Sequence, residues 1–365
     1  MQEPENPEHD FTSLNTRIEN FIQRENVASI SAAIISENEV IWENGFGRRD
    51  LNETDQARPE TIYLLASISK LVTATAVMQL AEQGKIDLDA DIGDYLPFPV
   101  RNPYHPDSII TPRHFLSHRS SMANPDFSEA PNFYEGFPAG KAPRLFPWIR
   151  NYITVGQPEY EPMIWKQHAP GEAIVSSNAG MALLGYLVEY VADVNFAEYC
   201  DTNIFEPLEM NDSGFRLGQV NQAKTATLYA ANGGKVEPFS VRFYPAVMLR
   251  SSTRDLSRFM MAFMNNGAYK SVRILEENSV QEMLEVKFSD ANLAFGSGLG
   301  LVWRSYRDGN WLGHTGGLAG VSASFDFHKS HKIGVIVLSN QSSVGAVYPG
   351  GEIYDLLHSE AQKFF

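Results

Sequence analysis

The sequence predicts an α+β fold in which the two ends of the chain build one antiparallel β-sheet flanked by helices. Strand-like apolar segments occur near both termini, separated by Gly or short polar breaks that suit antiparallel neighbours. Helical patterns lie between them, and residues 94–244 carry frequent Pro, aromatic residues and short helices, which indicates a mostly helical insertion. The 365 residues, 43% of them hydrophobic, suffice for two domains or for one large domain with an insertion.

The N-terminal third predicts a helix, two strands and a second helix. Residues 12–25 have the apolar spacing of an amphipathic helix. Residues 27–36 (VASISAAIIS) and 39–50 (EVIWENGFGRRD) predict two strands, with the polar ENE stretch at the turn between them. The segment 61–86 ends in a long helix, for which Gly84 is the predicted stop.

The C-terminal part predicts a run of strands followed by one helix. Strands are expected over 298–307, 309–316, 320–330 and 332–341, and a helix over 352–363. We therefore expect residues 1–93 and 245–365 to form the sheet domain and residues 94–244 a helical subdomain, with an active site where the two meet.

Charge and cysteine content narrow the function classes. The formal net charge of −15 disfavours nucleic acid as a partner, because an acidic surface repels phosphate. Cys200 is the only cysteine, so no internal disulfide forms, and its helical setting favours a buried thiol over a nucleophile.

The sequence predicts no membrane span, since no apolar run approaches roughly 18 residues. The polar, acidic N-terminus lacks a signal region. The location stays open: cytoplasmic, or periplasmic or secreted if an export signal was removed.

A serine and a lysine stand three residues apart at the start of the second predicted helix. Ser67 and Lys70 form an S-x-x-K pair whose side chains share one helical face within hydrogen-bond reach. A serine hydroxyl needs an adjacent base to become a nucleophile, and a lysine is such a base when burial lowers its pKa. The start of the helix also offers free backbone N–H groups that can stabilise an oxyanion. The alternative interpretation of the pair is structural: a serine that caps the helix beside a solvated lysine.

Two further segments carry polar or glycine-rich patterns. Ser176, Ser177 and Asn178 precede an apolar helical run, where capping needs only one of the three. Residues 313–317 (GHTGG) end a predicted strand, where glycines let a substrate backbone lie along the strand edge. The Gly317 N–H is a candidate second donor to an oxyanion. The alternative interpretation is a simple turn at the end of the strand.

Together, S-x-x-K, S-x-N and H-T-G in this order resemble the motif set of penicillin-binding proteins and serine β-lactamases. The chain also resembles the class C β-lactamase-like family of serine hydrolases and esterases over most of residues 30–340. That wider resemblance is carried by LLASISKLVTATAVMQLAEQGKIDLDADIGDYLP, ITPRHFLSHRSSM, PGEAIVSSNAGMALLGYLVE, IFEPLEM and GHTGGLAGVSASF. It implies a β-lactamase/transpeptidase-like fold, in agreement with the sheet and helical insertion.

The resemblance implies a role for each matching residue. Ser67 is the nucleophile and Lys70 its base; Ser67 and Gly317 supply the oxyanion N–H groups, and Asn178 orients Lys70 and a substrate carbonyl. Ser176 stands where this family usually has a proton-shuttling tyrosine, whereas penicillin-binding proteins and class A enzymes carry serine there. Because serine is shorter, we expect a bridging water or low activity.

His314, Thr315 and Gly316 are the expected substrate-binding residues. β-Lactamases mostly carry lysine in place of His314, and a histidine that titrates near neutrality attracts a carboxylate less strongly. H-T-G is common among the esterases, amidases and D-amino-acid peptidases of the family, which favours an ester or amide hydrolase over a dedicated β-lactamase.

The expected partner is a small-molecule or peptide substrate, with no cofactor, and the oligomeric state stays open. Alternatives are a β-lactamase, an acyltransferase or transpeptidase with the same residues, and a non-catalytic binding protein that keeps the fold. A binding module has no use for the complete residue set.

Three remaining features have weaker interpretations. His114 and His118 have a spacing that fits a metal on one helix face, but they fall in a segment that matches the family's structure, so no metal is expected. Arg119 replaces a usually small residue, and the sequence offers no reason for it. Aromatic residues between 126 and 165 either shape the substrate cleft or pack a loop: Phe127, Phe133, Tyr134, Phe137, Phe146 and Trp148.

Overall fold

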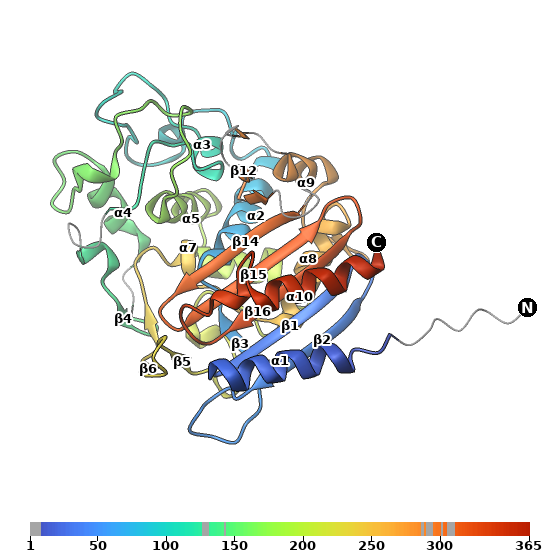
Figure 1. The fold of residues 1–365 in the computed structure, drawn as a ribbon. Coiled ribbons are helices and arrows are strands. Elements are labelled where there is room, and N and C mark those ends of the chain that lie inside the picture. The colour runs from blue at the N-terminus through green and yellow to red at the C-terminus, as the bar shows by residue number, and fades with distance from the viewer. Residues whose placement is uncertain are drawn as a thin grey trace, which may run out of the picture.

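The structure is a computed structural model that describes residues 9–125, 131–141, 144–285, 288–289, 295–300, 302–304 and 311–365. Its centre is an eight-stranded antiparallel sheet in the order β11-β12-β13-β14-β15-β16-β1-β2. The two chain ends meet inside this sheet, where β1 pairs with β16 from Ile30↔Ser339 to Ser36↔Ile333 (Figure 1). The strands of this sheet are β1 (Ser29–Ser36), β2 (Val40–Gly47), β11 (Phe288–Ser289), β12 (Phe295–Ser297), β13 (Val302–Arg304), β14 (Trp311–Leu318), β15 (Val321–His328) and β16 (Ile333–Ser339).

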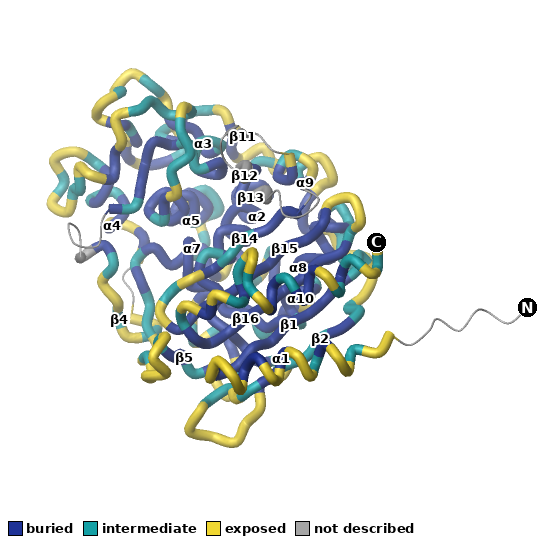
Figure 2. The backbone as a smooth tube through the Cα atoms, viewed as in Figure 1, coloured by how far each residue is buried: buried dark blue, intermediate teal, exposed yellow. Residues whose placement is uncertain are grey.

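Helices cover both faces of the sheet. One face carries the terminal helices α1 (Thr12–Glu25) and α10 (Glu352–Ala361), whose apolar sides are buried and whose outer sides are exposed (Figure 2). The other face carries α2 (Ser69–Glu82) and α8 (Thr253–Met264). Because β1 lies between these layers, Ile34 faces one core and Ile35 the other, and the strand reads as a continuous apolar run.

The middle of the chain is mostly helical and packs beside α2 at one end of the sheet (Figure 1). Helix α5 (Asn178–Ala192) contacts α2, α4, α6 and α7, so it is the buried centre of this region. The other helices are α3 (Pro112–Leu116), α4 (Leu145–Ile153), α6 (Phe196–Cys200), α7 (Tyr244–Val247) and α9 (Glu277–Leu284).

Short two-stranded pairs connect these layers. Strand β3 (Ile62–Leu64) pairs with β8 (Arg250–Ser252) directly before α2 and α8 begin. The remaining pairs are β4 (Phe137–Pro138) with β7 (Phe239–Ser240), β5 (Leu228–Tyr229) with β6 (Lys235–Val236), and β9 (Ala268–Tyr269) with β10 (Val272–Arg273).

The fold class predicted from the sequence is confirmed, and the first helix occupies the predicted residues 12–25. The strand predicted over 298–307 is shorter in the described residues: β13 spans Val302–Arg304, and Gly300 instead donates its N–H to the Leu116 carbonyl at 2.9 Å. Residues 301 and 305–307 of that predicted strand lie outside the described residues. The domain boundaries at 93/94 and 244/245 stay a prediction. No helix within the described ranges is long and apolar enough to cross a membrane.

Candidate active site

Ser67 lies in a tight turn between β3 and α2. The turn is a 3₁₀ helix, Ala66–Ile68, and Ala66 has the left-handed φ of 47° that L-residues rarely adopt. All of residues 61–80 are buried except Ser67, which is half-buried. The Ser67 hydroxyl is therefore the point at which this buried segment opens toward solvent.

Lys70 follows one turn later and reaches back to Ser67. Its Nζ donates to the Ser67 Oγ at 2.7 Å and to the Ala246 carbonyl of α7 at 3.1 Å. The side chain is 1% exposed, and burial lowers the pKa of Lys70 to about 7. A large share of the amine is therefore neutral near neutral pH, as a general base requires.

The backbone around this pair is tied down on both sides. The Ser69 hydroxyl donates to the Ala66 carbonyl at 2.6 Å and accepts from the Leu249 N–H at 2.9 Å. The Thr73 hydroxyl donates to the Pro245 carbonyl at 2.7 Å, which fixes α7 against α2. The Ala246 carbonyl, and with it the Lys70 amine, is thereby held in one place.

The end of β14 lies against the Ser67 turn. Within the described residues, strand β13 pairs with Trp311, Leu312 and Gly313 of β14, and the 3₁₀ turn that carries Ser67 also contacts β14. A Cβ on Gly316 would lie 2.1 Å from the Leu65 carbonyl, so this glycine is needed for the close approach. The Gly316 carbonyl accepts from the Tyr348 hydroxyl at 3.0 Å, and His314 Nδ1 is 2.6 Å from the Thr315 carbonyl.

The S-S-N segment begins α5, and capping explains one of its three residues. Ser177 is the N-cap and accepts from the Gly180 N–H at 2.9 Å. The Asn178 N–H donates to Asn124 Oδ1 at 2.7 Å. Ser176 is exposed, and within the described part of the chain neither its hydroxyl nor the Asn178 side chain makes a direct hydrogen bond to Ser67 or Lys70.

His118 and Arg119 lie near this site and make contacts that the sequence analysis did not predict. His118 has a left-handed φ of 58°, and its carbonyl accepts from the Val175 N–H at 2.7 Å. Burial, and then the nearby Lys70 charge, lower the pKa of His118 to about 4. A neutral imidazole therefore lies close to the lysine and next to the segment that leads into Ser176.

Arg119 extends the same connection. Its guanidinium donates to the Gly171 and Glu172 carbonyls at 2.8 and 3.2 Å, and its own carbonyl accepts from the Gly171 N–H at 2.8 Å. The arginine thus fastens the 171–172 loop that precedes the S-S-N segment. A sequence pattern cannot reveal such a contact because it joins residues about fifty positions apart.

The remaining sequence candidates are structural. His114 belongs to α3 and accepts from the Thr111 N–H in a capping box, whereas His118 lies beyond that helix, so the two do not share a helix face. Within the described ranges no cluster of three or more metal-ligating side chains occurs. Cys200 is buried, and burial raises its pKa, which keeps it a protonated thiol.

The aromatic residues of the predicted cleft region mainly pack against one another. Phe133 stacks on Phe243 with ring centroids 4.6 Å apart and is buried, as is Trp148. Phe146 is exposed and stacks on Tyr186 at 5.5 Å. Phe127 lies outside the described residues.

Comparisons with known proteins agree with this architecture. The family model described as Beta-lactamase matches residues 14–358. Protein flp of Staphylococcus aureus (strain MRSA252) is 24% identical over 334 residues, which are 90% of this chain and 63% of that protein. The chain thus spans less than two thirds of the length of this relative.

Solved structures show the same fold. The octameric penicillin-binding protein homologue from Pyrococcus abyssi superposes with a TM-score of 0.80 at 26% identity, covering 97% of this chain and 77% of that one. The β-lactamase/D-alanine carboxypeptidase from Pseudomonas syringae gives 0.74 at 20% identity over 96% and 98%. The family match over nearly the whole length, together with this fold and the S-x-x-K pair, makes the chain a member of the β-lactamase family with the fold of its serine hydrolases.

Proposed function

We propose that the protein hydrolyses an ester or amide bond through an acyl-enzyme formed on Ser67. The observation that carries the proposal is the Lys70 amine, which is buried, 2.7 Å from the Ser67 hydroxyl and shifted to a pKa of about 7. A serine with a partly neutral amine at this distance has the base that nucleophilic attack requires.

The proposed reaction has two steps, acylation of Ser67 and deacylation by water. As Ser67 Oγ bonds to the carbonyl carbon, its proton passes to Lys70 Nζ; the bond to the leaving group then breaks and the departing alcohol or amine takes up that proton. A water molecule next attacks the acyl carbon, loses its proton to the base, and releases the acid while the Ser67 hydroxyl re-forms.

The N–H groups of Ser67 and Gly317 are the proposed donors to the tetrahedral oxyanion. The approach of Gly316 to Leu65 supports this assignment because it brings the β14 edge to the Ser67 turn. One such donor contributes roughly 3–4 kcal/mol to transition-state stabilisation. Thr315 and Gly316 would hold the substrate backbone along the same edge.

Ser176 and Asn178 are proposed to act through water. The Ser176 hydroxyl is exposed and makes no direct hydrogen bond to the described side chains of the pair, so a bridging water would carry the proton from Lys70 to the leaving group. Asn178 would orient a substrate carbonyl from the start of α5. In this proposal the site lies where the proposed sheet domain (1–93 and 245–365) meets the proposed helical subdomain (94–244).

Small esters, amides and peptides are the proposed substrates. His314 stands where β-lactamases mostly carry a permanently charged lysine, which disfavours a carboxylate-bearing β-lactam as the preferred substrate. The relative from Pseudomonas syringae is described as both a β-lactamase and a carboxypeptidase, so both substrate types belong in one assay panel.

The test is turnover of p-nitrophenyl acetate by Ser67→Ala, with the melting temperature as a check on folding. We expect loss of turnover at an unchanged melting temperature. Cys200→Ala is the matched control, because it removes the only thiol and should keep its activity. Undiminished hydrolysis by Ser67→Ala would refute the proposal, and added amine or alcohol as acceptor separates hydrolysis from acyl transfer.

A further inference from the structure

A cavity of about 280 Å³ lies on the β3–β8 pair, and neither Ser67 nor Lys70 is among its lining residues. Arg250 of β8 and Leu64 of β3 form part of its wall, and the β5–β6 hairpin forms another part. Leu228 of this hairpin also packs against Gly320, in the turn that follows β14. The volume suits a small molecule rather than a polymer.

Arg250 is the unusual member of this wall. It is 3% exposed, and within the described chain its guanidinium has two acceptors, the Met248 and Phe239 carbonyls, both at 3.3 Å. Its five N–H donors are thus mostly unused. No carboxylate in the described residues forms an ion pair with it, and burial is the only cause that lowers the pKa of Arg250, to about 10.

The two acidic groups of the cavity, Asp50 and Glu53, already have partners other than Arg250. Glu53 pairs with Arg49 at 2.7 Å. Asp50 accepts from the Thr227 and Tyr229 hydroxyls at 2.7 and 3.0 Å, and those hydrogen bonds help to lower its pKa. A buried cation without a counter-charge is costly, and an anionic ligand would offset that cost.

The other walls are apolar or carry further positive charge. Two further cations line the cavity: Arg49, which pairs with Glu53, and Lys235 of β6, which is half exposed and 3.7 Å from Glu237. The apolar part of the wall consists of Leu64, Leu217, Leu228, Val236 and Pro238. An anionic head beside a short apolar wall fits a carboxylate with an aliphatic chain, and a planar guanidinium binds a carboxylate through two parallel hydrogen bonds.

We propose that this cavity is a binding site for a small monocarboxylate, whose carboxylate pairs with Arg250 and whose short apolar chain lies against Leu64 and Leu228. The site does not depend on the proposed hydrolase activity. The cavity is connected to the proposed catalytic residues through the chain, because Leu64, the last residue of β3, lies three residues before Ser67.

The experiment is titration of the protein with sodium hexanoate, followed by calorimetry and by the melting temperature. Hexanamide, which has the same chain without the charge, and inorganic phosphate, which has the charge without the chain, are the comparison ligands. We expect hexanoate to bind at least roughly tenfold more tightly than either. Equal affinity for hexanoate and hexanamide, or for hexanoate and phosphate, would overturn the proposal.

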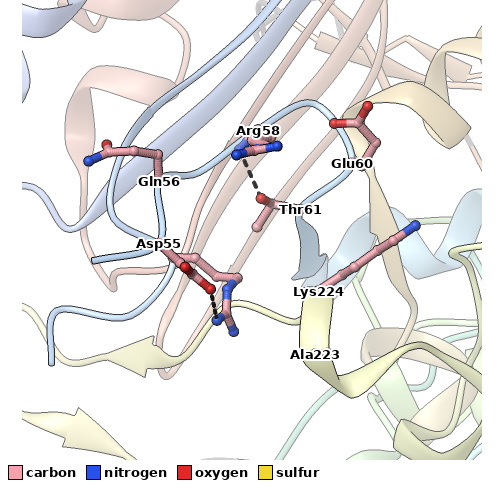
Figure 3. Close-up of a pocket in the computed structure, with 8 residues that line it drawn as sticks. Asp55, Gln56, Arg58, Glu60, Thr61, Ala223 and Lys224 are labelled. Carbon is pink, nitrogen blue, oxygen red and sulfur yellow. Dashed lines mark hydrogen bonds and ion pairs between the residues drawn. The ribbon is translucent and has the colours of Figure 1, made fainter. Parts of the chain in front are cut away.

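Arg250→Met removes the charge and keeps an unbranched side chain. We expect it to weaken hexanoate binding by at least roughly tenfold. The matched control is Arg58→Met, in a neighbouring surface pocket formed with Asp55, Glu60 and Lys224 (Figure 3), which should bind hexanoate as the wild type does. Unchanged hexanoate binding by Arg250→Met would overturn the proposal. The role of Arg250 would then be to hold β8 against β7 through its hydrogen bond to the Phe239 carbonyl.

Val236→Glu tests the same site without touching Arg250. It adds a carboxylate to the cavity from the partly exposed β6 strand, where folding is expected to tolerate it. We expect loss of hexanoate binding together with a raised melting temperature, because the new carboxylate offsets the buried charge. Hexanoate binding that survives in Val236→Glu would contradict the proposal. Ser67→Ala should bind hexanoate normally, which separates this result from the catalytic one.

Discussion

The Lys70 amine lies 2.7 Å from the Ser67 hydroxyl and is held by one further acceptor, the Ala246 carbonyl. Burial is the only cause that shifts its pKa, which falls from 10.5 to about 7. The pair therefore owes its proposed reactivity to the apolar packing of α2, α5 and α7 around the lysine. Its pH dependence follows from that packing.

The first prediction concerns the pH profile of hydrolysis. The base acts in its unprotonated form, so kcat/KM for p-nitrophenyl acetate should fall about tenfold per pH unit below an apparent pKa near 7 and level off above it. Lys70→Arg, which stays charged, should be inactive at every pH. If kcat/KM does not change between about pH 5 and about pH 9, Lys70 is excluded as the base.

The second prediction concerns stability. Because the folded-state pKa of Lys70 is lowered, the folded protein loses stability as the pH falls from 10.5 to about 7, and the loss is complete below that value. Lys70→Met removes this penalty. Its free energy of unfolding should exceed that of the wild type by up to roughly 5 kcal/mol at acidic pH, and the gain should vanish at strongly alkaline pH.

Denaturant titration across this pH range measures the difference. Lys85→Met is the control, since Lys85 is exposed and its replacement should leave no pH-dependent difference. A constant difference between Lys70→Met and the wild type at all pH values would show that the lysine is not neutral in the folded state.

The third prediction concerns the serine at the usual tyrosine position. A tyrosine at 176 reaches further than the exposed Ser176 hydroxyl, so Ser176→Tyr should raise kcat by roughly tenfold or more through direct proton transfer. Ser176→Phe supplies the ring without the hydroxyl and should give no increase. Equal rates for the two variants would assign any gain to packing.

The fourth prediction concerns the approach of β14 to Ser67, the proposed nucleophile. A Cβ at Gly316 would lie 2.1 Å from the Leu65 carbonyl, so Gly316→Ala must displace the strand edge or the Ser67 turn. We expect a loss of roughly 1–3 kcal/mol in stability, together with a lower kcat/KM. Gly345→Ala is the control because no atom lies within 4 Å of its added Cβ. Full activity in Gly316→Ala would argue against a catalytic strand edge.

The strands and helices near the two termini could be predicted because each has a local signature. The spacing of Leu14, Ile18, Phe21 and Ile22 defines the buried side of α1, and the apolar run of β1 marks a central strand. The strand predicted over 298–307 was wrong at its start, residues 298–300, because the Gly300 N–H donates to a partner distant in sequence, the Leu116 carbonyl. Tertiary contacts of this kind leave no periodic pattern.

The contact between Ser67 and Lys70 was predictable because the 3₁₀ turn that holds Ser67 runs directly into α2, which holds Lys70. Ser67 and Lys70 are one helical turn apart, so their contact follows from helix geometry. The structure was needed for three other residues. His118 and Arg119 contact partners that are distant in sequence, Lys70 and Gly171. Arg250 is buried without a counter-charge in the described chain. The capping role of Ser177 was foreseen only as one of three possibilities.

The most direct test of the central claim is the rate at which a fluorophosphonate labels the protein, measured against pH and mapped by mass spectrometry. The account predicts one adduct, on Ser67, formed at a rate that rises with an apparent pKa near 7 and is lost in Lys70→Met. An adduct on another residue, or labelling of Ser67 that proceeds equally fast without the lysine, would contradict it.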